Sequence, residues 1–137
     1  MQTKIDGAGG ITVASHKRMR TLKCHNVWSL IEVSADVLAV NSGNSIILWK
    51  IESNQTIAKL NGHAEPVRGM QLLKKGGRHV LLSAGEDKTM RVWDGSKKVL
   101  AIHTAHTKRI TSIIVLGSKV ISASDDGEIF IYNVIYG

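Results

Sequence analysis

Three stretches of this sequence repeat the same order of residues, and that repetition constrains the fold more than any other feature. The stretches align on His25, His63 and His106, which lie 38 and 43 residues apart. After each histidine, short runs rich in β-branched residues alternate with turns of Gly, Asn, Asp and Ser. Such runs are typical of short strands joined by tight turns. The pattern predicts an antiparallel meander of four strands that recurs every ~40 residues.

The predicted strands follow the same order in each unit. The first runs are Val27 to Val33, Val67 to Leu73 and Ile110 to Leu116. The second are Val37 to Val40, Val80 to Leu82 and Val120 to Ile121, and each third run ends in an aromatic residue, Trp49, Trp93 or Tyr132. Fourth runs, Thr56 to Leu60 and Val99 to Thr104, close the first two units. Ile11 to Ala14 and Arg18 to Lys23 are expected to be the third and fourth strands of a preceding partial unit.

Composition excludes several classes of protein. With 43% apolar residues among 137, the chain has enough apolar content to bury a core. Cys24 is the single cysteine, so neither an intramolecular disulfide nor a zinc site of the usual cysteine spacing can form. The start of the chain does not resemble a secretory signal, and no apolar run approaches the ~20 residues needed to span a bilayer. We therefore expect an intracellular protein, in the cytoplasm or the nucleus.

Two dipeptides and a repeated turn carry a family resemblance. Gly62-His63 precedes Trp93-Asp94 by about 30 positions, and the turn from Ser83 to Asp87 ends six residues before Trp93. Ser122 to Asp126, followed by Tyr132, repeats that turn. The sequence resembles the WD-repeat β-propeller family from Cys24 to Val134. The resemblance implies an all-β fold of four-stranded antiparallel blades, in a partial propeller of about three.

The repeats define the expected organisation of the chain. Residues 1–24 are expected to form a partial blade, 25–62 a degenerate WD-repeat blade, 63–105 the best-matching blade, and 106–137 a blade that lacks its last strand.

The resemblance also implies a buried polar network, a structural buttress, within each blade. In the middle blade its members are His63, Ser83, Asp87 and Trp93. In the last blade they are His106, Ser122, Asp126 and Tyr132, where the phenol O–H replaces the indole N–H. The first blade keeps His25 and Trp49 but has Gly43 at the Asp position and Ala39 at the Ser position, so we expect it to lack the network.

Catalytic and metal-binding interpretations of these residues are weaker. An Asp-His-Ser set also occurs in nucleophilic hydrolases, but catalysis needs one exposed nucleophile per domain, whereas this set recurs in each unit. His103 and His106 offer only two ligands for a metal ion, without a nearby acid or thiolate. We therefore expect no enzyme activity, no metal and no cofactor.

Positive charge is expected to gather at one end of the blades, because alternate turns of a meander lie at the same end. This basic end comprises Lys17, Arg18, Lys74, Lys75, Arg78, Lys97, Lys98 and Lys119. Such an end favours contact with RNA or an acidic protein segment.

The family resemblance implies a non-catalytic protein-interaction scaffold, as a subunit of a larger complex. Candidate partner-binding residues lie at the opposite, mixed-charge end: Glu65, Arg68, Lys88, Lys108 and Arg109. An RNA-associated factor that uses the basic end is the alternative. Neither a membrane nor a small-molecule substrate is expected.

Thirteen predicted strands fall short of the ~16 that the smallest closed propellers contain. Three interpretations follow: a fragment of a longer propeller, which we favour, a homo-oligomer, or an arc completed by a partner chain.

Overall fold

The computed structural model describes residues 2–5, 11–15, 20–75, 77–94 and 99–133, and its regular elements are all β-strands. Two strands near the N-terminus pair with each other, β1 (Gln2–Ile5) and β2 (Ile11–Ser15). The first blade comprises β3 (Leu30–Ser34), β4 (Val37–Ser42), β5 (Ser45–Lys50) and β6 (Gln55–Leu60). The middle blade comprises β7 (Val67–Lys75), β8 (Arg78–Gly85), β9 (Met90–Trp93) and β10 (Val99–His103). The third comprises β11 (Ile110–Leu116), β12 (Lys119–Ser124) and β13 (Ile129–Asn133).

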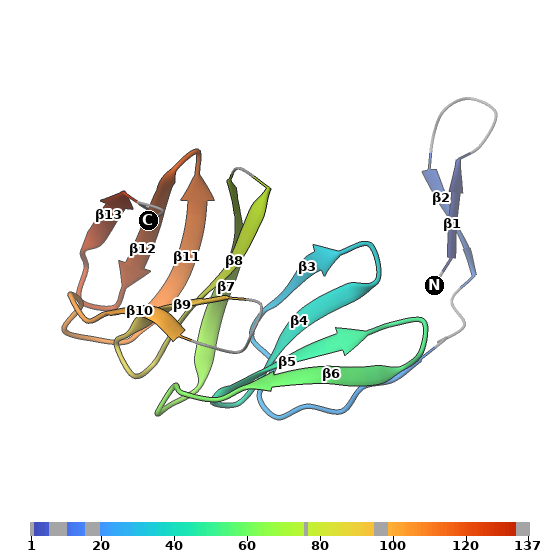
Figure 1. Ribbon diagram of the computed structural model, residues 1–137, viewed down its shortest axis with the longest axis horizontal. Coiled ribbons are helices and arrows are strands. Elements are labelled where there is room, and N and C mark those ends of the chain that lie inside the picture. The colour runs from blue at the N-terminus through green and yellow to red at the C-terminus, as the bar shows by residue number, and fades with distance from the viewer. Residues whose placement is uncertain (1, 6–10, 16–19, 76, 95–98, 134–137) are drawn as a thin grey trace.

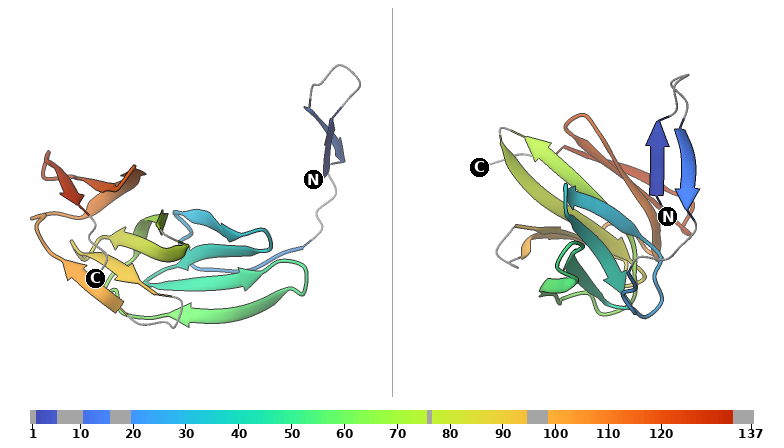
Figure 2. Two further views of the ribbon diagram at one scale, coloured as in Figure 1. Left: turned by 45° about the horizontal axis from the view of Figure 1, so that its top comes forward. Right: turned by 90° about the vertical axis from the view of Figure 1, so that its right-hand side faces the viewer.

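Each blade is an antiparallel meander in which sequence neighbours pair, as the repeats predicted. The first strand of the middle blade, β7, packs beside β3 on one side and β11 on the other. The three blades therefore follow one another along an arc (Figures 1 and 2). This arrangement confirms the partial propeller with open sheets that the sequence predicted.

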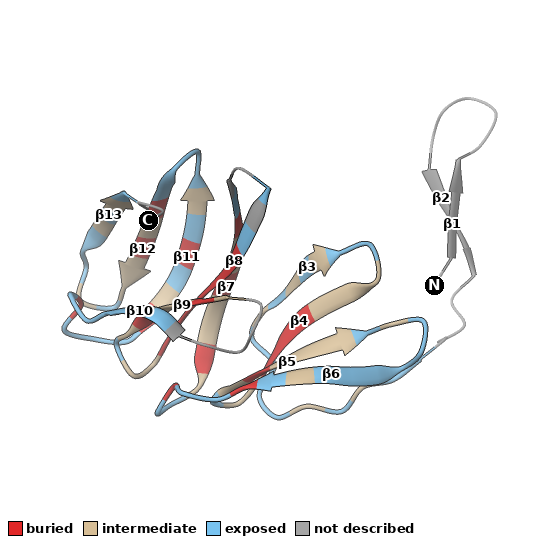
Figure 3. Ribbon diagram, in the orientation of Figure 1, coloured by how far each residue is buried: buried red, intermediate tan, exposed pale blue. Residues whose placement is uncertain are grey.

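The apolar core lies between the blades, where the sheets face each other (Figure 3). One buried cluster joins the first and middle blades and includes Ala39, Ile46, Met70 and Trp93. The other joins the middle and third blades and includes Leu82, Met90, Ile113 and Val120. Because side chains alternate across a strand, each blade presents one face to its predecessor and the other to its successor.

We name these two faces by their neighbours. The backward face of the middle blade carries Leu81, Ser83 and Trp93 and packs toward the first blade. Its forward face carries Leu82, Ala84 and Met90 and packs against the third blade. Strand pairing shows which residues of the three blades are equivalent. Leu81 pairs with Trp93 in the middle blade, Val120 with Tyr132 in the third and Leu38 with Trp49 in the first, so these three pairs occupy the same place.

The N-terminal region differs from the sequence prediction. Ile11–Ser15 is a strand, but its partner is Gln2–Ile5, which the sequence analysis missed. Residues 20–23, part of the predicted strand Arg18 to Lys23, are not in a strand, and residues 18 and 19 lie outside the described residues. The polar run Gln2–Ile5 offers too little apolar alternation to stand out in the sequence. No helix in the described ranges is long and apolar enough to cross a membrane.

Candidate functional site

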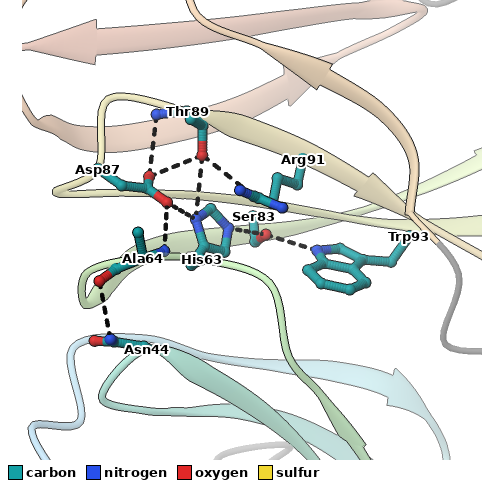
Figure 4. Close-up of polar contacts among 8 residues, drawn as sticks. All are labelled: Asn44, His63, Ala64, Ser83, Asp87, Thr89, Arg91 and Trp93. Carbon is teal, nitrogen blue, oxygen red and sulfur yellow. Dashed lines mark hydrogen bonds and ion pairs between the residues drawn. The ribbon is translucent and has the colours of Figure 1, made fainter.

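Four side chains of the middle blade form a continuous hydrogen-bonded chain (Figure 4). His63 Nδ1 lies 2.9 Å from Asp87 Oδ2, and His63 Nε2 lies 2.7 Å from Ser83 Oγ. The Trp93 indole N–H donates to the same Ser83 Oγ at 2.8 Å. His63 precedes β7, Ser83 lies in β8, Asp87 in the β8–β9 turn and Trp93 at the end of β9. The network therefore ties β8, β9, the turn between them and the link before β7 together.

One proton order gives every member of this network a partner. An indole nitrogen can only donate, so Ser83 Oγ accepts from Trp93, and in this order Ser83 directs its own proton to His63 Nε2. His63 then carries its proton on Nδ1 and donates it to Asp87. A neutral imidazole satisfies both ring nitrogens in this arrangement. The order leaves no member unpaired inside the protein, where an unsatisfied polar group is costly.

Asp87 holds the loop as well as the histidine. Its Oδ2 accepts from the Ala64 N–H at 3.0 Å, and its Oδ1 accepts from the Thr89 hydroxyl at 2.8 Å and the Thr89 N–H at 3.1 Å. Asn44 Nδ2 of the first blade donates to the Ala64 carbonyl at 3.1 Å. Thr89 was not among the network residues predicted from the sequence. An Asp-x-Thr turn, whose hydroxyl reaches back to the carboxylate, is the signal that would have found it.

These contacts shift the pKa of both network carboxyls. Burial raises the pKa of Asp87, but the hydrogen bonds from His63, Thr89 and Ala64 outweigh burial and hold it well below its usual value. For Asp126 in the third blade, burial also raises the pKa. Hydrogen bonds from the Glu128 N–H, His106 and the Thr107 N–H outweigh it and lower the pKa to about 2. Both carboxylates stay ionised well into the acidic range.

The folded protein is expected to lose stability steeply as the pH falls. Because the folded pKa of Asp87 lies below the unfolded value of ~3.9, the stabilisation is present above that value and is lost as the pH falls toward the folded pKa. Asp87→Asn should lower the melting temperature at pH 7 and flatten its decline below about pH 4.5. Thermal unfolding at several pH values measures both effects. Asp36→Asn, outside the networks, is the control, and an Asp87→Asn variant as steep as wild type would refute the assignment.

The third blade repeats the histidine and serine contacts but not the aromatic one. His106 Nδ1 lies 3.0 Å from Asp126 Oδ2, and His106 Nε2 lies 2.8 Å from Ser122 Oγ. The Tyr132 phenol does not replace the indole N–H as expected: within the described contacts its ring packs 5.3 Å from that of His103. Phe130 instead packs 4.4 Å from the His106 ring. Since both ring nitrogens of His106 are engaged, His103 and His106 do not form a ligand pair.

The first blade lacks the network, and the structure corrects how its residues align. His25 is exposed, and it contacts the blade through its backbone N–H, which donates to Ser42 Oγ at 3.0 Å. Val40, not Ala39, is the register equivalent of Ser83, because Val40 pairs with Ile47 as Ser83 pairs with Arg91. The connection between the paired residues Leu38 and Trp49 is one residue shorter than that between the equivalent pair Leu81 and Trp93.

A buried asparagine stabilises the first blade in place of the network. Asn41 is fully buried, and its Oδ1 accepts from the backbone N–H groups of Trp28 at 2.7 Å and Ser29 at 2.9 Å. Its Nδ2 donates to the Asn26 carbonyl at 2.8 Å. Trp49 is half-buried, and its indole donates to Asn54 Oδ1 at 3.1 Å. Asn41 thus fixes the link before β3, a role that the sequence analysis missed.

The order Ser83, His63, Asp87 matches the connectivity of a hydrolase triad, but its geometry does not suit attack on a substrate. Ser83 is 0% exposed, and its oxygen already accepts the Trp93 indole N–H. Ser122 is equally buried. A nucleophile must reach a substrate carbonyl from an open site. Neither hydroxyl does so in this structure.

A different set of polar contacts crosses the surface from blade to blade. It lies at the loop end, the end that carries the β4–β5, β8–β9 and β12–β13 turns and the links between blades. Glu86 Oε1 accepts from Arg68 at 3.3 Å and from Arg109 at 3.2 Å, and Arg109 also donates to Asp125 at 2.6 Å. The Arg68 guanidinium lies 3.9 Å from the centre of the Trp28 ring. Hydrogen bonds and charge from Asp125 and Glu86 raise the pKa of Arg109.

We call this set the loop-end stripe: Trp28, Arg68, Glu86, Arg109 and Asp125. Arg68 and Arg109 were candidate partner-binding residues, and the structure joins them through Glu86. The other three candidates, Glu65, Lys88 and Lys108, are exposed in the neighbouring loops. Trp28, Glu86 and Asp125 were not among the partner-binding residues predicted from the sequence.

The structure places only part of the basic end. Lys74 near the end of β7 and Lys119 at the start of β12 are exposed, and Lys119 Nζ donates to Asn133 Oδ1 at 3.2 Å. Lys17, Arg18, Lys97 and Lys98 lie outside the described residues, and the side chains of Lys75 and Arg78 are likewise not described.

Comparisons with known proteins agree with this architecture. The family model for the WD domain, G-beta repeat (WD40), matches residues 54–94 and 97–133. The chain therefore belongs to the WD40 repeat family. Each match begins one strand earlier than the corresponding blade, because β6 and β10 pair with the preceding sheet.

Relatives and solved structures give the same family. The chain is 31% identical to the CCR4-associated factor 4 homolog of Candida glabrata over 123 residues, covering 78% of this chain and 21% of that protein. It is 31% identical to the pre-mRNA-splicing factor cwf17 of Schizosaccharomyces pombe over 100 residues, covering 72% of this chain and 29% of that protein. The WD40 β-propeller domain of Doa1 superposes with a TM-score of 0.71 and 25% identity, covering 78% of this chain and 37% of that one. The chain spans less than a third of these curated relatives.

Proposed function

We propose that this chain is a non-catalytic protein-interaction scaffold, a subunit of a larger complex, whose partner binds at the loop end. The observation that carries the proposal is the loop-end stripe. In it, Trp28 before the first blade contacts Arg68 of the middle blade, and Glu86 joins Arg68 to Arg109 before the third blade. Arginine and tryptophan are enriched at the centres of protein interfaces. Trp28 is exposed beneath Arg68, so the stripe offers an aromatic surface as well as charge.

The buried networks support this role by making the loops rigid. Asp87 and Asp126 each hold their own turn and the preceding link through His63 and His106. A pre-organised surface binds with less loss of conformational entropy than a flexible one. We therefore assign these sets, with His25 and Trp49 at the matching places of the first blade, to structural support rather than to chemistry.

The relatives support the same proposal. One is named for its association with another factor and one for pre-mRNA splicing. Fold alone does not determine function, so the role rests on the surface described above. By the same comparison we propose an intracellular location. We also propose that 25–62, 63–105 and 106–137 act as successive units of one propeller.

Charge reversal at the loop end tests the proposal. Lys88→Glu with Lys108→Glu changes two exposed residues beside the stripe without altering the stripe itself. Placing like charges in an interface costs several kcal/mol, so partner recovery should fall at least about tenfold. The measurement is quantitative mass spectrometry of proteins captured from lysate by the immobilised chain.

The matched control is Lys50→Glu with Lys74→Glu, two exposed lysines at the opposite end, with the same change in net charge. Proteins lost by the first variant and kept by the control are those that bind the loop end. Proteins lost only by the control would instead bind the opposite end, where Lys50 and Lys74 lie. Equal recovery by all three chains would contradict the proposal.

RNA association through the basic end is the second candidate function. It is favoured by exposed Lys74 and Lys119, which lie on the neighbouring β7–β8 and β11–β12 hairpins. Reversing Lys74, Lys75, Lys97 and Lys98 to Glu should abolish salt-sensitive retention on heparin or RNA, because backbone binding depends on released counterions. Unchanged retention would exclude this candidate.

A further inference from the structure

The forward face of the third blade carries an exposed apolar surface. Leu116, Ile129 and Ile131 are 64%, 67% and 63% exposed, and Ile114 lies among them. Register places Ile114, Ile121 and Ile131 side by side across β11, β12 and β13, with Ala123 and Ile129 in the next row. Exposed apolar residues scattered singly are ordinary, but a contiguous sheet face of this kind marks a contact surface.

The equivalent face of the middle blade is buried against its neighbour. By register, Leu116, Ile121, Ala123 and Ile129 are equivalent to Leu73, Leu82, Ala84 and Met90. Those four middle-blade residues are at most 3% exposed, because the backward face of the third blade covers them. The same side-chain types recur at the same places. The forward face of the third blade is therefore built to pack against a backward face.

A matching backward face, covered only in part, lies at the other end of the arc. Leu38, Val40 and Trp49 of the first blade occupy the places of Leu81, Ser83 and Trp93. They line a groove of about 320 Å³ together with Leu30 and the preceding segment, which contributes Arg20, Thr21, Leu22, Cys24 and Val27. Leu30 is 62% exposed. Val40 replaces the network serine, so this backward face is apolar where the other two are polar.

One pair of opposite charges lies at matching places on the rims of the two open faces. Lys119, at the start of β12, lies on the forward face of the third blade at the register place of Val80. Glu32 lies on the backward face of the first blade and is exposed, at the register place of Leu72. Val80 and Leu72 both lie near the β7–β8 turn, so Lys119 and Glu32 mark the same end of their blades. A lysine and a glutamate would then meet when the two faces pack as the inner blades do.

We propose that two copies of this chain associate head to tail, with the forward face of the third blade of each copy packed on the backward face of the first blade of the other. The contact repeats the packing that already joins the middle and third blades. Such heterologous contacts close into a ring when the rotation allows it. Two copies then bring six blades together, of which the two third blades have three described strands each. This inference is independent of the loop-end function.

Single substitutions on each open face test the association. Ile131→Lys and Leu30→Lys each place a charge on one face at a side chain already exposed in the single chain, so the fold should tolerate both. The wild-type chain should have twice the mass of one chain by light scattering after size-exclusion chromatography, and each variant should have the mass of one chain. Ile102→Lys, at a residue 50% exposed on outer strand β10, is the control and should leave the mass unchanged.

Mixing the two single-site variants gives the decisive measurement. A mixed dimer contains one interface with both substitutions and one interface with neither, so the mixture should recover dimers that neither variant forms alone. A dimer of Leu30→Lys alone would mean that third-blade faces pair with each other, which overturns the head-to-tail arrangement. A wild-type monomer, or dissociation by Ile102→Lys, would overturn the proposal. Far-ultraviolet circular dichroism confirms that each variant is folded.

Discussion

Trp93→Ala is expected to lower the free energy of unfolding by about 3–5 kcal/mol, the range for removing a large buried aromatic side chain. Trp93 is 1% exposed and belongs to the core that joins the first and middle blades. Its loss also leaves Ser83 without the indole donor, inside a network whose other members are buried. Urea unfolding followed by circular dichroism measures the change.

Two further substitutions separate the packing and hydrogen-bonding contributions. Trp93→Phe keeps an aromatic ring in the core but removes the N–H, so it should cost about 1–2 kcal/mol. Trp28→Ala removes a tryptophan that is 54% exposed and should cost less than about 1 kcal/mol. If Trp93→Ala and Trp28→Ala were equally destabilising, Trp93 would not be the anchor of the blade that its burial indicates.

The strands from β3 to β13 could be predicted because sequence and structure share the same periodicity there. Val67 to Leu73 and Ile110 to Leu116 alternate toward and away from the core, and turns of Gly, Asp and Asn separate them. In the middle blade, each motif residue type matches its contact. The Trp93 indole donates to Ser83, Ser83 bonds His63, and His63 bonds Asp87.

The first blade shows where sequence alignment alone fails. Counting ten residues back from Trp49 gives Ala39, as counting back from Trp93 gives Ser83. The shorter β4–β5 turn moves the register by one, so Val40 takes that place. Asn41 looks like an ordinary turn residue in the sequence. Only the fold of the preceding link over β4 shows its amide bound to three backbone groups.

Contacts between blades could not be predicted from the sequence for a different reason. Glu86 of the middle blade meets Arg109, which precedes the third blade and lies 23 residues away in the chain. A meander places turns at an end, but it does not determine which side chains of neighbouring blades meet there. The exposed apolar faces could not be predicted for the same reason. Apolar alternation in β11 to β13 indicated strands, but the exposure of their side chains depends on which blade lies next to them.

Gly85→Ala is expected to destabilise the chain by about 3 kcal/mol, because the added methyl group has no space to occupy. A Cβ at Gly85 would lie 2.5 Å from the Pro66 carbonyl oxygen and 3.1 Å from Val67 Cα. Both neighbours are backbone atoms. That carbonyl also accepts the Glu86 N–H at 3.0 Å, and Val67 N–H donates to the Gly43 carbonyl at 2.9 Å. Moving the Pro66 segment would therefore disturb both the β8–β9 turn and the junction with the first blade.

Gly117→Ala is the matched control, since it makes the same chemical change without a steric clash. Gly117 has φ of +61° and no atom within 4 Å of an added Cβ, so its cost is the backbone strain of about 1 kcal/mol. Thermal and urea unfolding of both variants should rank Gly85→Ala as clearly the less stable. An equal loss in both would mean that the Pro66 segment can move aside freely. The Asp87 contact to Ala64 and the Glu86 contact to Pro66 both oppose that movement, because they hold the same link from its two ends.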